Sequence, residues 1–288
     1  SKLHWEREET MKKFLIFLLL IPSAIFSNGE DLLNMAKYFY LENDYYSAIT
    51  ESMRFQCLYP EDKLYPESMV IMGKSFFKTG RAELALNTFS QCYSNFYSTE
   101  SGQEALFLSG VVRLLSGSFL YGDVTFRRYN FIYKDGIFYK ESLFNSGIAS
   151  ALAENYDEAK RIFYEYKSLF PEGSQEVNAV IDKIQKEEKR QKKSPAIAGL
   201  LSALIPGSGY LYTENYRLAG LSIATNAALI GLAYDGYRKN NKFQLIFFSI
   251  IEFSFYNYSI AGAIKSAKEY NEPRDLNEEL LLMVKRRF

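Results

Sequence analysis

One carboxylate lies inside an apolar stretch near the end of the chain, and its setting suggests chemistry. Glu252 stands near the middle of Phe243–Ile264, and Asn226 near the middle of an earlier apolar run, Leu218–Tyr234. A charge within lipid is costly, so an acidic group there is a candidate for carrying protons or receiving a cation. The alternative is structural: a protonated Glu252 hydrogen-bonds Asn226 and joins the two segments, a bond worth about 1 kcal/mol. Because no second acid lies nearby to continue a relay, the structural role is favoured.

The residues that most enzymes use for catalysis are otherwise scarce. His4 is the only histidine of the 288 residues, and it precedes Met11 in a charged leader. Without it a mature chain has no His-based triad, metal site or general base. Cys57 and Cys92 are the only cysteines and lack a C-x-x-C spacing, so we expect buried thiols rather than a disulfide. Lys plus Arg equal Asp plus Glu at 34 each, so no net charge directs the chain to nucleic acid. We expect no enzyme, no metal and no cofactor.

The start of the chain indicates export. Two lysines after Met11 precede an apolar core, Phe14–Ile21, and small residues follow up to Gly29, which is the order of a secretory signal. We expect residues 1–10 to be a leader or a mis-set start, and residues 11–29 to be a signal peptide. An uncleaved anchor is the alternative, although the apolar core is short for a membrane span.

The first half of the chain repeats with a period of 37 residues. Small residues recur at this interval, namely Ala48, Ala85, Gly122 and Ala159. Twelve residues before each of them stands another small residue, in turn Ala36, Gly73, Gly110 and Gly147. Four residues after the last three stands a phenylalanine, at Phe89, Phe126 and Phe163. The pattern predicts two helices per unit that approach closely where small residues meet aromatic rings. Units must stack, because one unit cannot bury its apolar face alone.

This order of apolar, small, aromatic and proline positions resembles the tetratricopeptide repeat (TPR) from about Gly29 to Pro171. The period is about three residues longer than the usual 34. The family's second small position in the second helix holds larger residues here, which are Phe55, Cys92, Tyr129 and Tyr166. We therefore expect a looser superhelix. The resemblance implies an all-α, TPR-like α-solenoid of four helix pairs over residues 30–193, and the sequence after Pro171 predicts a capping helix.

In the TPR family the first helix of each pair lines a concave groove that grips peptides. Carried over to this sequence, the resemblance implies a partner-binding groove formed by Lys37, Tyr40, Lys74, Phe77, Lys78, Phe107, Val111 and Phe144, with Leu114, Leu115, Ile148 and Leu152 beside them. Such a groove is basic and aromatic at one end and apolar at the other. It suits a peptide carboxylate followed by an apolar segment. Two alternatives stay open: the lysines form a solvated helix face, and the apolar residues pack against the closing helix or the membrane domain.

A row of glutamates has the same period as the repeats. Its members are Glu30, Glu67, Glu104 and Glu141. Each lies in the first turn of a predicted first helix, where a carboxylate meets the positive end of the helix dipole. We interpret the row as structural.

From Pro195 onward the chain becomes strongly apolar. Phe243–Ile264 is long enough for a membrane span of about 20 residues, and Leu218–Tyr234 is adequate with its flanks. Pro195–Tyr212 is shorter and is interrupted by Pro-Gly-Ser-Gly at 206–209. Inside lipid such a break is tolerable only where protein or water satisfies the freed backbone groups. This segment therefore either spans thinly or dips into the membrane and returns.

The sequence around the break, SALIPGSGYLYTENYRLAG, resembles a bacterial membrane hairpin module of the pattern PGxGQxYxG, similar to TM2-type hairpins. Tyr210 stands where that pattern has Gln. The resemblance implies attachment to a lipid bilayer without a defined reaction. We expect a membrane domain of two or three apolar helices over residues 194–266 and an amphipathic tail over residues 267–288.

Two basic clusters, Lys183–Lys193 and Arg238–Lys242, conflict with export of the repeats, because the positive-inside rule puts both in the cytoplasm. If the first apolar segment only dips in, exported repeats and a cytoplasmic Arg238–Lys242 are compatible. The sequence thus predicts a TPR scaffold in the bacterial inner membrane, with periplasmic repeats that bind protein or peptide partners and aid envelope assembly. The alternative is a small transport or proton-coupled module that uses Glu252.

Overall fold

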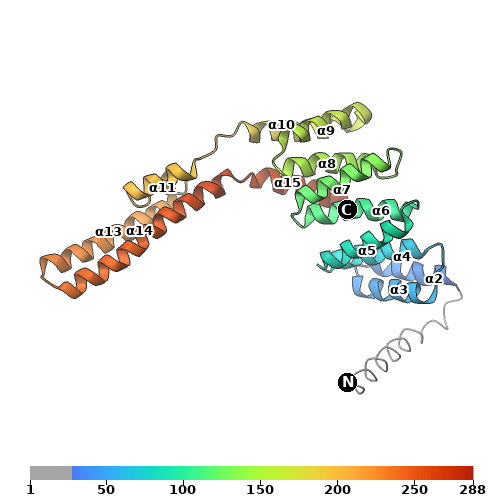
Figure 1. Ribbon diagram of the computed structural model, residues 1–288, viewed down its shortest axis with the longest axis horizontal. Coiled ribbons are helices and arrows are strands. Elements are labelled where there is room, and N and C mark those ends of the chain that lie inside the picture. The colour runs from blue at the N-terminus through green and yellow to red at the C-terminus, as the bar shows by residue number, and fades with distance from the viewer. Residues whose placement is uncertain (1–27, 288) are drawn as a thin grey trace, which may run out of the picture. The chain divides into compact units, whose positions relative to one another are not determined.

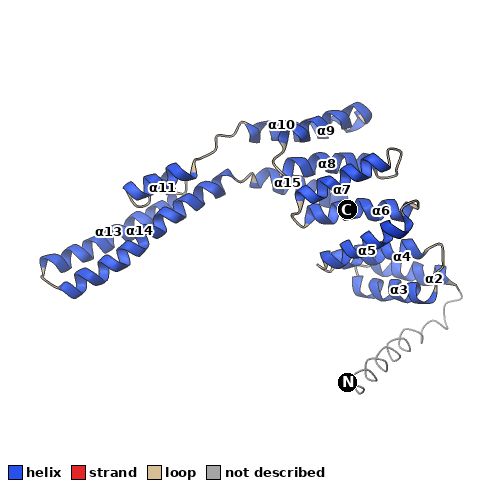
Figure 2. Cartoon of the chain, in the orientation of Figure 1, coloured by secondary structure: helices blue, strands red, loops and turns tan. Residues whose placement is uncertain are grey.

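The computed structural model describes residues 28–287, which form helices and contain no strand (Figure 2). Two compact units are present. One contains the repeats up to Gln185 together with the end of the chain from Asn277, and the other is Lys186–Leu276. The leader expected over residues 1–10 and the signal peptide expected over residues 11–29 lie outside the described residues except for Asn28 and Gly29. Asn28 caps the first described helix by accepting a hydrogen bond from the backbone N–H of Asp31.

Four helix hairpins follow one another along the repeat unit (Figure 1). They are α2 (Gly29–Leu41) with α3 (Tyr45–Leu58), α4 (Tyr65–Lys78) with α5 (Ala82–Phe96), α6 (Glu100–Leu115) with α7 (Phe119–Ile132), and α8 (Tyr139–Leu152) with α9 (Tyr156–Leu169). Each helix packs against its successor, and the first helices α2, α4, α6 and α8 also contact one another in order. The hairpins are therefore stacked, which confirms the predicted all-α, TPR-like solenoid of four helix pairs.

The predicted closing helix is also present. A short 3₁₀ turn, η2 (Pro171–Gly173), leads into α10 (Ser174–Glu188). One face of α10 is buried, and it carries Val177, Val180, Ile181 and Ile184. The opposite face is polar, as the end of a repeat stack requires.

Close contacts between glycines and aromatic rings hold each hairpin together. A Cβ atom added to Gly73 in α4 would lie 2.4 Å from Cε1 of Phe89 in α5. The equivalent distances are 2.6 Å from Gly110 to Phe126 and 2.8 Å from Gly147 to Phe163. All three rings are fully buried. The small residues predicted at this period therefore exist because the ring of the second helix occupies the space of a side chain.

The turn inside each hairpin repeats as well. A residue with positive φ follows each first helix, at Asn43, Gly80, Gly117 and Glu154. After each of these, a backbone N–H bonds back to a carbonyl five residues earlier, as in Arg81 N to Phe76 O at 2.9 Å. This is the Schellman ending of a helix, which satisfies carbonyls that the helix leaves unpaired. The period of 37 therefore extends to the backbone.

The second unit consists mainly of four helices. They are α11 (Pro195–Leu204), α12 (Ser208–Tyr212), α13 (Tyr216–Arg238) and α14 (Lys242–Asn271). The long helices α13 and α14 pack against each other, and α11 and α12 pack against α14. The final helix, α15 (Arg274–Arg287), agrees with the amphipathic helix expected from Asp275, but from Asn277 onward it belongs to the repeat unit.

The backbone N–H groups at the Pro-Gly break form hydrogen bonds with other parts of the protein. Gly207 has a φ of +93°, a conformation that favours glycine, and its N–H donates to Ser259 Oγ at 2.9 Å. The N–H of Gly209 donates to Ser202 Oγ at 3.1 Å, and a Cβ on Gly209 would lie 2.0 Å from the carbonyl oxygen of Ala198. Side chains of α11 and α14 thus replace the hydrogen bonds that the break removes, as a lipid environment requires.

Adding a methyl group to Gly73 and to Gly220 should have opposite effects on stability. A Cβ on Gly220 in α13 meets no atom within 4 Å, so Gly220→Ala should stabilise its helix by up to about 1 kcal/mol. Gly73→Ala pushes against the Phe89 ring and should destabilise the repeats by about 1–3 kcal/mol. Thermal unfolding followed by circular dichroism measures both changes. Adding Phe89→Leu should recover part of the loss, whereas a Gly73→Ala chain more stable than the parent would contradict the close contact.

Candidate functional site

The predicted groove residues lie at equivalent positions on the first helices of the repeats. Lys37 in α2, Lys74 in α4, Val111 in α6 and Ile148 in α8 are separated by 37 residues each and share one helix face. Their burial rises along the stack. The two lysine side chains are partly exposed, whereas Val111 and Ile148 are 1% and 0% exposed. The groove predicted from the sequence is therefore open at the α2–α4 end only.

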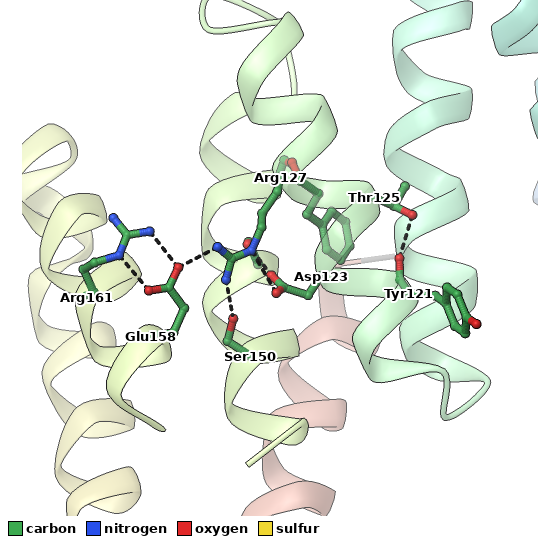
Figure 3. Close-up of polar contacts among 10 residues, drawn as sticks. Tyr121, Asp123, Thr125, Arg127, Ser150, Glu158 and Arg161 are labelled. Carbon is green, nitrogen blue, oxygen red and sulfur yellow. Dashed lines mark hydrogen bonds and ion pairs between the residues drawn. The ribbon is translucent and has the colours of Figure 1, made fainter. Parts of the chain in front are cut away.

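The α8 end of this face is covered. All eleven residues from Ser142 to Leu152 are buried, so no side of α8 faces solvent along that length. The predicted groove residues Phe107 and Phe144 are buried too. Leu280 and Val284 of α15 are fully buried, and Lys183 of α10 pairs with Glu279 of α15. Figures 1 and 3 both show α15 beside α8. The alternative of packing against the closing helix agrees with this burial.

At the open end, two predicted groove lysines pair with the glutamate row. Lys37 Nζ lies 2.7 Å from Glu67 Oε1, and Lys74 Nζ pairs with Glu104 Oε1. Each pair joins the first helix of one hairpin to that of the next. The glutamates, interpreted from the sequence as helix-dipole residues, thus also link the repeats. In the sequence, these ion pairs could have been recognised from the constant spacing of 30 residues between each lysine and its glutamate. Because both lysines already have carboxylate partners, they do not present unpaired charges to a peptide.

Three predicted groove residues stay accessible at the open end. Tyr40 and Phe77 are partly exposed, and Lys78 is exposed. Tyr40 lies against Tyr45 with ring centroids 5.6 Å apart, and burial raises the pKa of its hydroxyl, so the hydroxyl stays protonated and able to donate a hydrogen bond. This end therefore offers aromatic surface and a hydroxyl, with a cation at its edge.

A polar cluster that the sequence did not suggest joins the third and fourth hairpins (Figure 3). Arg127 Nε donates to Asp123 Oδ2 at 2.8 Å, and its Nη1 donates to Glu158 Oε1 at 2.6 Å. Asp123 also accepts a bond of 2.8 Å from the Ser146 hydroxyl, and Glu158 accepts two bonds of 2.7 Å from Arg161. Every bond connects α7, α8 and α9 or lies within one of them. The cluster is structural, because its charges are matched internally.

The predicted bond between Asn226 and Glu252 is absent. Asn226 donates to the backbone carbonyl of Ser222 at 2.7 Å, and its own oxygen is buried without a partner. The hydrogen bonds between α13 and α14 instead include one from the Ser222 hydroxyl to Ser259 at 2.8 Å. Glu252 is half-buried. The pairing was wrong because the rotation of each helix about its axis, which the sequence does not reveal, turns serines toward the contact.

Two helices of the second unit are long and apolar enough to cross a membrane. These are α13 and α14, with mean hydropathies of 1.3 and 1.2 over their most apolar windows. Of those windows, 11% and 6% of the residues are buried. Large apolar side chains therefore point outward, among them Leu221, Ile250 and Phe253, each more than 60% exposed. By length and composition alone this is weak evidence for a membrane, although a soluble core helix would be mostly buried.

Both cysteines are free thiols, but only one is buried as expected. Cys92 is fully buried against the backbone carbonyls of Pro66 and Ser101, and burial raises its pKa to about 12. Cys57 is exposed on α3. The two therefore differ strongly in reactivity, since the thiolate is the reactive form.

Comparison with known proteins gives overall likeness only. No protein-family model matches the chain, and none of the curated proteins matches it. A solved tetratricopeptide repeat protein from Parabacteroides merdae ATCC 43184 has a TM-score of 0.48 and 14% identity, covering 89% of this chain and 98% of that one. The apo form of RapI has a TM-score of 0.47 and 14% identity, covering 93% and 96%. The stacked helix pairs of this chain are themselves the basis for the repeat fold.

The Arg127 cluster should make the repeats sensitive to acid. Glu158 has a pKa of about 2 instead of 4.5, chiefly because Arg161 donates hydrogen bonds to its ionised form; burial opposes this effect and Arg127 adds to it. A carboxyl with a lowered pKa stabilises the fold above its ordinary pKa, and this stabilisation is lost as the pH falls from about 4.5 toward 2. In chemical denaturation at several pH values, Glu158→Gln should flatten this dependence. Glu165→Gln, nearby on α9 and half-exposed, is the control, and an unchanged slope in Glu158→Gln would contradict the account.

Proposed function

We propose that this chain is a membrane-tethered scaffold whose repeats bind a protein or peptide partner on the open end of the face shared by α2 and α4. The observation that carries the proposal is the change in burial along equivalent positions of the first helices. The face is covered by the chain itself at α8, but at α2 and α4 it presents Tyr40, Phe77 and Lys78. A stacked repeat with an uncovered inner helix face is suited to binding.

The chemistry of this open end supports a particular kind of partner. Aromatic rings that are partly exposed supply contact area with little loss of conformational entropy, as in other binding surfaces. The paired lysines and glutamates at Lys37–Glu67 and Lys74–Glu104 neutralise each other. Affinity would therefore come from apolar and aromatic contacts.

Tethering is supported by the second unit. The helices α13 and α14 have 23 and 30 residues, which at about 1.5 Å per residue exceed the roughly 30 Å of a bilayer core. The helix α11 has 10 residues and is too short to cross. These lengths support a topology in which α11 dips into the membrane while α13 and α14 span it. In this topology the repeats can lie outside the cytoplasm while Arg238–Lys242 lies inside it. We propose the bacterial inner membrane, periplasmic repeats and a role in envelope assembly on this basis together with the signal peptide expected from the sequence of residues 11–29.

Photo-crosslinking in living cells tests partner binding. A photoreactive phenylalanine at Tyr40 or at Phe77 should capture the same protein, because both positions lie on the proposed surface. The photoreactive phenylalanine placed at Tyr164 should not capture this protein. Tyr164 is 53% exposed on α9, the second helix of the last hairpin. Capture is identified by mass spectrometry after purification of the membrane fraction. If Tyr40 and Phe77 yield no common product, or if Tyr164 yields the same product, the proposed surface is wrong.

The natural cysteines test the orientation of the repeats. A membrane-impermeant maleimide added to intact spheroplasts should label the chain at the exposed Cys57, and the labelled chain should sediment with membranes. Cys57→Ser should abolish labelling, since Cys92 is buried and its pKa is about 12. Cys92→Ser is the matched control and should label as strongly as the parent. Labelling that appears only after the membrane is broken would place the repeats in the cytoplasm, and recovery in the soluble fraction would contradict tethering.

A further inference from the structure

A separate hollow lies between the second helices of two neighbouring hairpins. Its volume is about 290 Å³, and it contains none of the predicted groove residues. The helix α6 contributes Leu106, Ser109 and Arg113, whose spacing of three and four residues puts them on one face. The helices α5 and α7 add residues that include Tyr93 and Arg128. We call it the Arg113–Arg128 pocket.

The charge in this pocket is not compensated by the protein. Arg113 and Arg128 line it, and no Asp or Glu does. Within residues 28–287 neither arginine forms an ion pair, whereas Arg54, Arg127 and Arg161 each have a carboxylate partner. The Nε atom of Arg113 is buried and has no hydrogen-bond partner there. Two positive charges therefore face the same hollow with N–H donors to spare.

Tyrosine rings hold both guanidinium groups in place. Cζ of Arg113 lies 6.0 Å from the ring centroid of Tyr121, and Cζ of Arg128 lies 5.0 Å from that of Tyr93. Stacking on a ring fixes the plane of a guanidinium without consuming its N–H groups. Both arginines are thus oriented before any ligand arrives, which reduces the entropy lost on binding.

Two hydroxyl groups of the pocket already donate to backbone carbonyls. Thr125 Oγ1 donates to the carbonyl of Tyr121 at 2.7 Å, as Figure 3 shows, and Ser109 Oγ donates to the carbonyl of Ala105 at 2.9 Å. The arginine forks are the charged donors available to a ligand. Such forks match the oxygens of phosphate or carboxylate in a bidentate arrangement.

Charge and lining favour phosphate over carboxylate. A phosphate monoester carries about −1.5 to −2 at pH 7 and compensates both arginines, while a carboxylate compensates one. The remaining lining includes the apolar side chains of Leu86, Leu106 and Val124. We propose that the Arg113–Arg128 pocket binds a phosphate monoester carried on an apolar or aromatic body. The site is independent of the α2–α4 surface, since the two share no residue.

Calorimetric titration of the full chain in detergent with phenyl phosphate tests the site. Phenyl phosphate should bind at least tenfold more tightly than benzoate, which has one charge, and more tightly than inorganic phosphate, which lacks the aromatic body. Arg113→Gln and Arg128→Gln should each weaken phenyl phosphate by at least tenfold, as expected for loss of a charge-assisted hydrogen bond. Arg128→Lys should weaken it less, because charge is kept and only the fork is lost.

Arg81→Gln is the matched control. Arg81 is likewise exposed and stacked on a tyrosine, with Cζ 5.1 Å from the ring centroid of Tyr46, but it does not line the pocket. It should leave affinity unchanged. Arg128 is exposed, so Arg128→Gln should fold, and circular dichroism would show this. The affinity of Arg128→Gln therefore decides the outcome even if Arg113→Gln is unstable.

Three results would overturn the proposal. They are no heat of binding for phenyl phosphate at millimolar concentration, equal affinity for benzoate, and undiminished affinity in Arg128→Gln. A phosphotyrosine peptide distinguishes the source of the phosphate. Tighter binding of the peptide than of phenyl phosphate supports a phosphorylated polypeptide, and equal or weaker binding supports a small phosphate ester.

Discussion

A single packing constraint determines the repeat unit: the first helix must lack a side chain where the ring of the second helix meets it. Gly73, Gly110 and Gly147 satisfy it with Phe89, Phe126 and Phe163. Because the ring fills the space that a Cβ would need, the two helix axes approach closely and the ring is removed from water. A buried phenylalanine contributes roughly 1.5–3 kcal/mol of transfer free energy, more than any exposed polar contact of the unit. In the first hairpin Ala36 and Ser52 take these positions, and both are fully buried.

The stacked hairpins, the closing helix and the short broken helix before the long apolar pair were predictable, because each depends on local periodicity or on a local break. Only two of the four turns inside the hairpins could be recognised from the sequence. Gly80 and Gly117 are 37 residues apart, but Asn43 and Glu154 take the same left-handed backbone without a glycine to announce it. The Lys–Glu links and the Arg127 cluster were missed for another reason. They connect different hairpins, so they depend on the stacking distance, and a period alone does not state that distance.

The second unit shows where polar residues in an apolar sequence go. Gly207 and Ser222 both bond Ser259, and Gly209 bonds Ser202. Short hydroxyl side chains satisfy a broken backbone and join helices without needing a charge, as is common between helices in lipid. Sequence reasoning gave this role to Glu252 and Asn226, the most conspicuous polar residues. Serines were overlooked because they are ordinary in any helix, and only the helix rotation shows which of them face inward.

In the repeat unit, many charged side chains pair with an opposite charge, and several of these pairs match one hairpin to the next. Arginines without such a partner are therefore informative. Exposed ion pairs such as Lys37–Glu67 contribute about 0–1 kcal/mol, so their main effect is to match one hairpin to the next. The Arg127 cluster does the same with less exposed carboxylates, since the side chains of Asp123 and Glu158 are 10% and 21% exposed. Arg113 and Arg128 depart from this pattern, because within residues 28–287 neither has a carboxylate partner. The Nε atom of Arg113 is also buried without a hydrogen-bond partner, as is that of Arg54. The packing of the hairpins does not account for two arginines without carboxylate partners at the wall of one hollow. A local conflict of this kind is typical of a binding site, where the missing partner arrives with the ligand.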